Sequence, residues 1–166
     1  MPTYGVRPAT LDDLEALVHH RVAMFTDMGV VFDALALADV TRAWLRSMIP
    51  AGEYHAWVCE IASGEIVAGG GASLLKWPPG PLSVRGDRLA FVYNVYTEPE
   101  HRKRGLARRV METIHAWCDQ HGIGALALNA SPAARHLYDS LGYVDAPSPM
   151  LFKVTPPGLA KPGGFR

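Results

Sequence analysis

The sequence predicts a mixed α/β (α+β) domain, in which about four helices pack against a mixed central sheet of about seven strands. Runs rich in β-branched and aromatic residues alternate with segments whose apolar residues recur at helical spacing. One such strand, at residues 89–97, leads through a basic turn into a long amphipathic helix. The length of 166 residues suits one domain with a substantial core. We place this domain at residues 1–155 and expect a poorly ordered Pro- and Gly-rich tail at 156–166.

The N-terminal half contains the signals of three strands and two helices. Thr10 and Asp13 form a near capping box for the first helix, and Gly29 provides a stop. Pro50 closes the second helix, because proline has no N–H to continue it. The expected elements are a strand at 4–8, a helix from Leu14 to Gly29, a helix at 33–49, and hairpin strands at 54–61 and 66–75.

The C-terminal half resumes this alternation after an exposed loop rich in Pro and Gly at residues 77–87. Ser131 is expected to cap the last helix, with Pro132 at its first position and Gly142 at its end. The expected elements are strands at 89–97 and 124–128, helices at 103–120 and from Ser131 to Gly142, and closing strands at 143–144 and 150–154.

Composition argues against several classes of protein. The formal net charge is zero, so we expect neither nucleic acid nor a membrane surface as a partner. Cys59 and Cys118 are too few for a disulfide framework and lie in apolar patterns, which indicates buried thiols. No Cys/His spacing indicates a metal. The chain lacks a signal-peptide pattern and a membrane-spanning run, so we expect a cytoplasmic protein.

The most informative segment is the basic turn before the helix at 103–120. The first N–H groups of a helix have no internal partner and lie at the positive end of its dipole. A strand that enters a helix through a Gly-bearing turn therefore makes an anion site. Gly105 and Ala107 are small, so a phosphate can approach the backbone closely. These features favour a pyrophosphate ligand.

Two other interpretations of this basic cluster remain open. The arginines and lysine from Arg102 to Arg109 are also compatible with a solvated helix start or a nucleic-acid patch. We rank nucleic acid last, because basic residues elsewhere are balanced and no aromatic residues interleave the cluster.

Residues 89–143 resemble the GCN5-related N-acetyltransferases (GNAT). Arg102, Gly105 and Ala107 match the family's acyl-CoA signature, Gln/Arg-x-x-Gly-x-Gly/Ala. The segment at 129–143 matches a second family motif that ends Leu-Tyr-x-x-x-Gly-Phe/Tyr. The resemblance implies the GNAT acyl-CoA N-acyltransferase fold. There the strand before the turn and the strand after its helix run parallel and splay apart, with acyl-CoA in the wedge.

The resemblance also implies which residues bind acetyl-CoA. Backbone groups of Val95, Tyr96 and Thr97 would pair with the thioester and pantetheine arm like an added strand. Ser131 and Asn129 would lie beside the pantetheine. The pyrophosphate would be held by the turn and the first residues of the helix, namely Arg102, Lys103, Arg104, Gly105, Leu106, Ala107 and Arg108.

Tyr138 matches the family's general acid, which protonates the departing thiolate. A phenol has the reach for this role and a pKa near that of a thiol. The backbone N–H near Val95 or Tyr96 would donate to the oxyanion. The alternative is that Tyr138 is a core tyrosine packed against Leu141.

The general base departs from the family pattern. Many members carry a Glu on one of the two splayed strands, but residues 89–97 and 124–129 contain no carboxylate. Tyr93 or Asn94 could order a water that takes the proton, and a substrate amine of low pKa would need no base. Nearby histidines are further candidates, namely His19, His20 and His55.

Family resemblance places the acceptor groove at the first two helices and the loop between them. The candidate acceptor residues are Phe25, Asp27, Met28, Val31 and Phe32, together with Tyr93 and Asn94. Asp27 would suit a primary amine.

The leading hypothesis is an acetyl-CoA-dependent N-acetyltransferase that acts on a primary amine of a small molecule or peptide by direct attack through a tetrahedral intermediate. The alternative is a catalytically silent acyl-CoA-binding or sensing module. A homodimer is compatible with the apolar closing strands.

Overall fold

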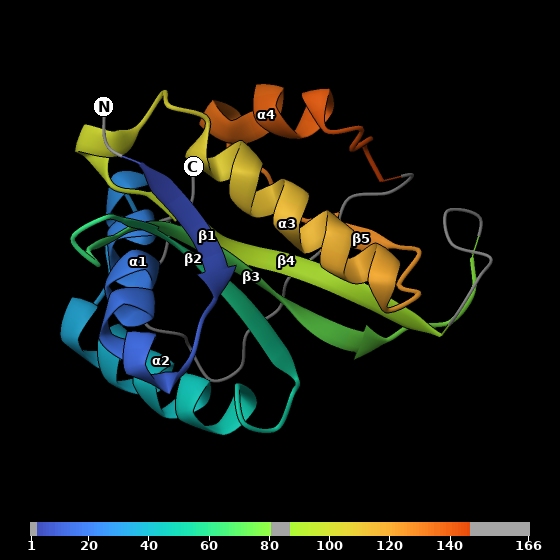
Figure 1. The fold of residues 1–166 in the computed structure, drawn as a ribbon. Coiled ribbons are helices and arrows are strands. Elements are labelled where there is room, and N and C mark those ends of the chain that lie inside the picture. Colours follow the sequence, from blue (N-terminus) through green and yellow to red (C-terminus); the bar gives the residue numbers. More distant parts are fainter. Residues whose placement is uncertain (1–2, 81–86, 147–166) are drawn as a thin grey trace.

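In the computed structural model, which describes residues 3–80 and 87–146, a sheet separates two helical layers (Figure 1). Within these residues the sheet has five strands in chain order, β1 to β5. Strands β1 to β4 are antiparallel neighbours, and β5 runs parallel to β4. The strands are β1 (Tyr4–Pro8), β2 (Tyr54–Ile61), β3 (Ile66–Lys76), β4 (Arg88–Thr97) and β5 (Leu126–Leu128). The helices are α1 (Leu14–Asp27), α2 (Ala34–Met48), α3 (Leu106–Gln120) and α4 (Arg135–Ser140).

The predicted fold class is confirmed, with fewer strands than expected. The expected strand at 143–144 is wrong: no strand forms there within the described part of the chain. The Tyr143 N–H instead donates to the Tyr138 carbonyl oxygen at 3.1 Å and closes the end of α4. The expected strand at 150–154, the domain boundary at 155 and the tail at 156–166 lie outside the described residues.

Two expected helix starts need correction. Helix α3 begins at Leu106 rather than Lys103, because Lys103 and Gly105 have φ angles of 60° and 75°, in the left-handed region. The side chain of Ser131 makes no capping hydrogen bond. A 3-10 turn at Pro132–Ala134 follows it, and α4 begins at Arg135.

The expected start of the first helix is confirmed. Thr10 and Asp13 form the capping box, with the Thr10 N–H donating to the Asp13 carboxylate at 2.8 Å. The box caps a short 3-10 turn at Leu11–Asp13 that leads into α1. At the second helix, Asp33 caps α2 by accepting from the Ala36 N–H at 2.9 Å.

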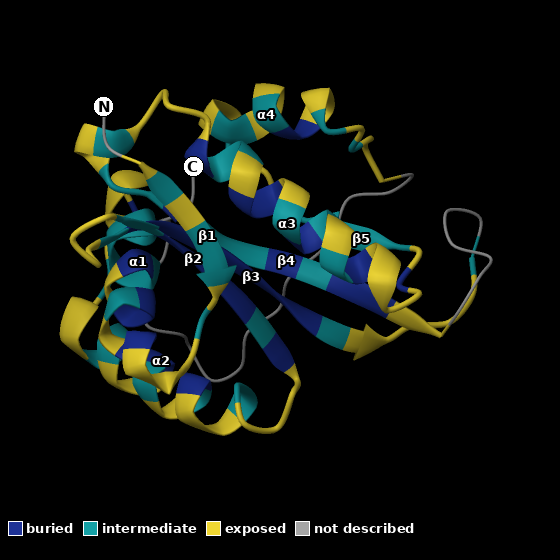
Figure 2. Cartoon of the chain, viewed as in Figure 1, coloured by how far each residue is buried: buried dark blue, intermediate teal, exposed yellow. Residues whose placement is uncertain are grey.

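The sheet has a hydrophobic core on each face (Figure 2). Alternate residues of β2 point to opposite faces, because side chains alternate along a strand. Trp57 and Cys59 join the core beneath α3, and Tyr54 and Val58 join the core beneath α1 and α2. Cys59 and Cys118 are buried free thiols, as expected.

A β-bulge interrupts the pairing of β3 with β4. Gly69 pairs with Tyr96 and Gly71 with Tyr93, so Gly70 lies opposite both Asn94 and Val95. Asn94 takes up the extra residue with a φ of 60°. A bulge bends its strand and increases the local twist; beyond it β4 stays paired with β3 but no longer with β5.

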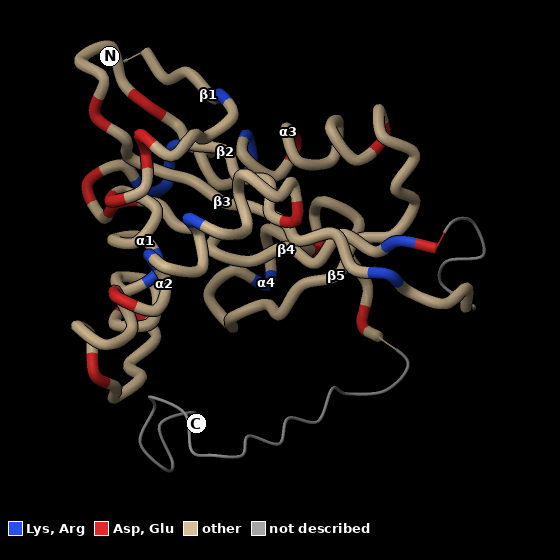
Figure 3. The backbone as a smooth tube through the Cα atoms, turned by 90° about the horizontal axis from the view of Figure 1, so that it is seen from below, with Lys and Arg blue, Asp and Glu red and all other residues tan. Residues whose placement is uncertain are grey.

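Charges of both signs are interspersed over the fold, in agreement with the zero net charge (Figure 3). None of the helices in the described ranges is both long and apolar enough to cross a membrane.

Candidate functional site

The backbone between β4 and α3 presents a row of unused hydrogen-bond donors. After a 3-10 turn at Pro99–His101, the N–H groups of His101 and Arg102 donate to carbonyls of the same turn. The next N–H with a protein acceptor is that of Arg109, which donates to the Gly105 oxygen at 3.1 Å. The N–H groups of residues 103–108 therefore have no acceptor among the described residues. We call residues 103–108 the phosphate loop.

The geometry of the phosphate loop suits an anion. Its N–H groups lie at the N-terminal, positive end of α3. A Cβ built on Gly105 would meet no protein atom within 4 Å, so this backbone is open to a ligand. Lys103 and Arg104 are exposed and form no ion pair with a carboxylate in residues 3–80 and 87–146. The loop therefore combines free donors, an open backbone and uncompensated positive charge.

Arg102 differs from the loop that follows it. Its Nε donates to the Thr97 carbonyl oxygen at 2.9 Å, and its Nη2 donates to the carboxylate of Asp27. Its guanidinium also lies over the Tyr96 ring, 5.5 Å from the centroid. Arg102 thus ties the end of β4 to the end of α1, and it compensates the charge of Asp27.

The C-terminal half of β4 has an open edge on the side of β5. Pairing with β5 ends at Val92, opposite Leu128, while β4 continues to Thr97. On that side Val95, Tyr96 and Thr97 have no strand partner within the described ranges. An extended ligand arm can therefore pair there by strand addition. Exposed Asn129 and half-buried Ser131 follow directly after the last paired residue of β5.

Tyr138 packs in the core beneath α3, with a residue exposure of 7%. Its hydroxyl makes no hydrogen bond to another described residue and is not among the fully enclosed unpartnered atoms. Burial raises the pKa of Tyr138, so the phenol stays protonated at neutral pH. Tyr138 is thus a core residue whose protonated hydroxyl is neither paired within the described residues nor fully enclosed.

The two histidines of α1 differ sharply in environment. The His19 side chain is 59% exposed and lies 2.8 Å from Glu98. His20 is 2% exposed, and both of its ring nitrogens are enclosed without a hydrogen-bond partner. Burial, with a smaller contribution from His19, lowers the pKa of His20 to about 4. The Glu98 carboxylate lies 3.6 Å from the His20 Nε2, beyond hydrogen-bond distance.

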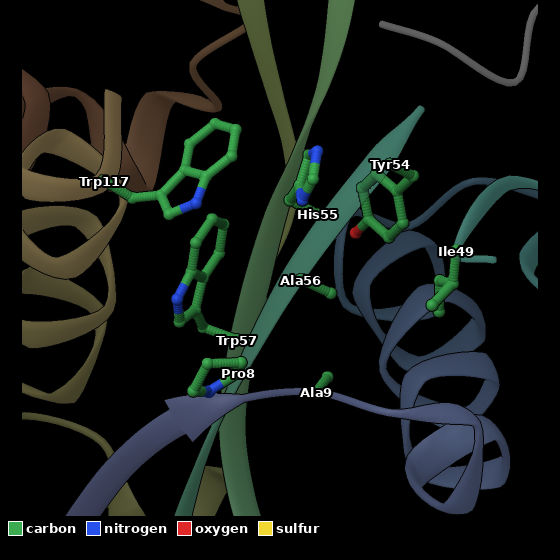
Figure 4. Close-up of a pocket in the computed structure, with 8 residues that line it drawn as sticks. All are labelled: Pro8, Ala9, Ile49, Tyr54, His55, Ala56, Trp57 and Trp117. Carbon is green, nitrogen blue, oxygen red and sulfur yellow. The ribbon is translucent and has the colours of Figure 1, made fainter. Parts of the chain in front are cut away.

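His55 lies far from the phosphate loop. It packs on Trp117, with ring centroids 4.3 Å apart, about 16 Å along α3 from Leu106. Both side chains line a hollow of about 220 Å³ at the edge of β2, beyond the last residue of β1 (Figure 4). The other lining residues are Pro8, Ala9, Ile49, Tyr54, Ala56 and Trp57. Apart from His55, none of the predicted site residues lines this hollow.

Of the predicted acceptor residues, Tyr93 and Asn94 lie on the face of β4 that packs against α1 and α2, whereas Asp27 pairs with Arg102. Tyr93 stacks on Tyr54 with centroids 5.4 Å apart, and its hydroxyl contacts the Ser73 hydroxyl. The rings of Phe25 and Phe32 meet edge to face at 6.1 Å. Met28 and Val31 are exposed. Arg21 links the two phenylalanines to Asn94, and we call Phe25, Phe32, Tyr93 and Asn94 the acceptor surface.

Sequence reasoning missed Arg21, which lies at the centre of this surface. Its Nη1 donates to Asn94 Oδ1 at 2.6 Å, and Asn94 Nδ2 donates to the Tyr54 hydroxyl at 3.2 Å. Its guanidinium lies 4.7 Å from the Phe25 ring centroid. Nothing in the local pattern distinguishes Arg21 from the other basic residues of the helices, because its surroundings come from β2 and β4.

Within residues 3–80 and 87–146, no group of three or more His, Cys, Asp or Glu side chains is placed to hold a metal ion.

Comparison with known proteins identifies this arrangement. Residues 17–143 match the acetyltransferase (GNAT) family, and the chain belongs to that family. It is therefore an acyltransferase of the class that carries out acyl-CoA-dependent N-acetylation. No curated protein matches the sequence.

Solved structures share the whole fold. A GCN5-related N-acetyltransferase from Ralstonia eutropha JMP134 is 34% identical with a TM-score of 0.81, over 92% of this chain and 99% of the other. A predicted acetyltransferase with acetyl-CoA from Clostridium acetobutylicum is 20% identical with a TM-score of 0.81, over 91% of this chain and 96% of the other. An aminoglycoside 6'-N-acetyltransferase from Acinetobacter baumannii is 16% identical with a TM-score of 0.71, over 92% and 99%.

Proposed function

We propose that this enzyme transfers an acetyl group from acetyl-CoA to a primary amine of a small molecule or peptide. The neutral amine attacks the thioester directly and forms a tetrahedral intermediate, which collapses to the amide and free CoA. The observation that carries this proposal is the free donor row of residues 103–108 beside the open edge of β4. A pyrophosphate on the loop places its pantetheine arm along Val95, Tyr96 and Thr97.

Each group of the chain has a defined part in this reaction. The N–H of Val95 or Tyr96 donates to the developing oxyanion. Tyr138 gives its proton to the departing thiolate, and its raised pKa keeps that proton available at neutral pH. The proton of the amine leaves through water ordered at Tyr93 and Asn94. Arg102 holds the end of β4 in place through the Thr97 carbonyl.

A pair of tyrosine variants tests this assignment. Tyr138→Phe removes the proton donor, and Tyr143→Phe removes a neighbouring hydroxyl that lies 3.0 Å from His115. General acid catalysis contributes about 100- to 10,000-fold, so we expect kcat to fall at least 100-fold in Tyr138→Phe, with an unchanged Kd for acetyl-CoA. Tyr143→Phe should keep the kcat of the wild type.

Equal kcat values for wild type and Tyr138→Phe would remove Tyr138 from the mechanism. Binding of acetyl-CoA without turnover of any amine would favour a silent acyl-CoA-binding module instead. A cytoplasmic location and a homodimer stay predictions.

A further inference from the structure

We propose that the amine acceptor carries an oxyanion, a carboxylate or a phosphate, which the guanidinium of Arg21 binds at the acceptor surface. This inference rests on the proposed function and adds the class of its substrate. Its basis is the positive charge of Arg21 at the acceptor surface, which no Asp or Glu side chain of the chain balances.

Arg21 has no Asp or Glu side chain as a partner. Five other arginines lie within 4 Å of an Asp or Glu, namely Arg7, Arg42, Arg102, Arg108 and Arg135. None of the carboxylates in the described ranges pairs with Arg21. The remaining segments, residues 1–2, 81–86 and 147–166, contain no Asp or Glu, so this holds for every carboxylate side chain.

Because Arg21 is half-buried, the lack of a counter-ion for its charge costs free energy. The side chain is half-buried between Phe25 and the tyrosine pair of Tyr54 and Tyr93. Burial lowers the pKa of Arg21, and the phenols of Tyr54 and Tyr93 oppose this change only in part, with no carboxylate among the causes. A desolvated cation without a counter-ion is unfavourable, and such groups gather at binding sites.

The free hydrogen-bond donors of Arg21 match an oxyanion. Nη1 is used by Asn94, which leaves Nε and Nη2 without a partner among the described residues. These atoms are absent from the set of fully enclosed unpartnered atoms, so they are not sealed in the core. Two neighbouring donors on one planar group bind a carboxylate or a phosphate in bidentate fashion.

The position of Arg21 links this anion site to the reaction. Asn94, which holds the guanidinium, occupies the bulge of β4 next to Val95, whose N–H is proposed to bind the oxyanion of the thioester. An anion on Arg21 therefore lies beside the reacting carbonyl. Asp27 competes poorly as an amine ligand here, because Arg102 already neutralises its charge.

The test uses pairs of amines with and without the anion, and KM is compared per neutral, unprotonated amine because an anion also raises the pKa of a nearby amine. The carboxylate arm compares phenylalanine with phenylalaninamide, and the phosphate arm compares glucosamine 6-phosphate with glucosamine. In the wild type we expect the anionic member of one pair to have a KM at least tenfold below its neutral partner. The arm that shows this preference identifies the oxyanion.

Variants of Arg21 separate recognition from a structural role. Arg21→Met keeps a long side chain over Phe25 but removes the charge, and Arg46→Met removes an exposed charge of α2 as a control. Arg21→Met should raise the KM of the anionic amine at least tenfold and leave the KM of the neutral amine and the Kd of acetyl-CoA unchanged. Arg46→Met should behave as the wild type.

Two results would overturn the inference: equal KM values for both members of each pair in the wild type, or an equal rise for both members in Arg21→Met. If no amine turns over, calorimetric binding of the same pairs to the CoA-loaded protein decides. If the wild type binds the anionic amine more tightly and Arg21→Met does not, the inference stands and the proposed function is refuted. No preference would refute the inference.

Discussion

Gly105 offers the sharpest test of the phosphate loop. Its φ of 75° lies in the left-handed region, and a Cβ there would meet no protein atom within 4 Å. Gly105→Glu therefore costs stability only through the backbone, about 1–2 kcal/mol for a side chain in this conformation. Gly64, in the turn between β2 and β3, has a φ of 86° and equally open space, so Gly64→Glu is the matched control.

The effect of Gly105→Glu on ligand binding is much larger than its effect on stability. Two unit charges 4 Å apart repel by about 1 kcal/mol in bulk water and about 4 kcal/mol near a protein surface. A Glu carboxylate beside a pyrophosphate therefore costs about 2–4 kcal/mol, roughly a 30- to 1000-fold loss of affinity. Gly64→Glu adds the same charge away from the loop and should leave the Kd unchanged.

Calorimetric titration with acetyl-CoA at fixed ionic strength measures this difference, and urea unfolding checks that both variants lose similar stability. The reasoning would be refuted if Gly105→Glu bound acetyl-CoA within threefold of the wild type. It would also fail if Gly64→Glu lost as much affinity as Gly105→Glu.

Three further predictions concern the two faces of the sheet. Gly71→Ala should lower the free energy of unfolding by about 3 kcal/mol, because its Cβ would overlap the Tyr54 ring and lie 2.7 Å from the His55 backbone oxygen. Gly5→Ala is the control, because a Cβ there has open space, and it should change the free energy of unfolding little in urea titrations. The depressed pKa of His20 means that the unfolded chain binds its proton first, so stability is full above pH 6.5 and falls as the pH drops toward 4. From pH 7.5 to 5 the wild type should lose about 2 kcal/mol of its free energy of unfolding in this way, and His20→Gln should not. Urea unfolding that gave wild type and His20→Gln the same pH dependence would contradict the lowered pKa of His20. Asp27→Asn breaks an exposed ion pair and should lower the unfolding free energy by less than about 1 kcal/mol; a larger loss would show that Arg102 needs it to hold β4.

The elements that the sequence predicted well are those with local signals. The capping box of Thr10 and the strand at 54–61 depend on contacts within a few residues or on residue types that favour strands. The phosphate loop was also predictable, because its glycine and its place between strand and helix determine where free N–H groups gather.

The features that were missed depend on contacts between distant elements. The start of α3 shifts because Lys103 adopts a positive φ, which its residue type does not indicate. Tyr143 turns back onto Tyr138 instead of extending a strand, with ring centroids 5.7 Å apart. Arg21 becomes significant only because β4 supplies Asn94 and no acidic residue approaches it.

That the bulge lies in β4 rather than in β3 could not be predicted from the sequence. Three consecutive glycines in β3 are compatible with many irregularities, and only the pairing shows that Gly70 faces two residues of β4. A Cβ on Gly70 would lie 3.1 Å from side-chain atoms of both Val110 and Val95, so glycine here also permits the close approach of α3.

The most direct test of the proposed reaction is to incubate the wild-type protein with acetyl-CoA and a set of primary amines that includes the two pairs named above. Free CoA and acetylated amine are measured in the same reaction. We predict that one amine is converted to its amide by mass spectrometry with an equal amount of CoA released, and that Tyr138→Phe loses at least 100-fold of this rate. Tight binding of acetyl-CoA with no amide from any amine, or CoA release without amide, would contradict the assignment as an amine acetyltransferase.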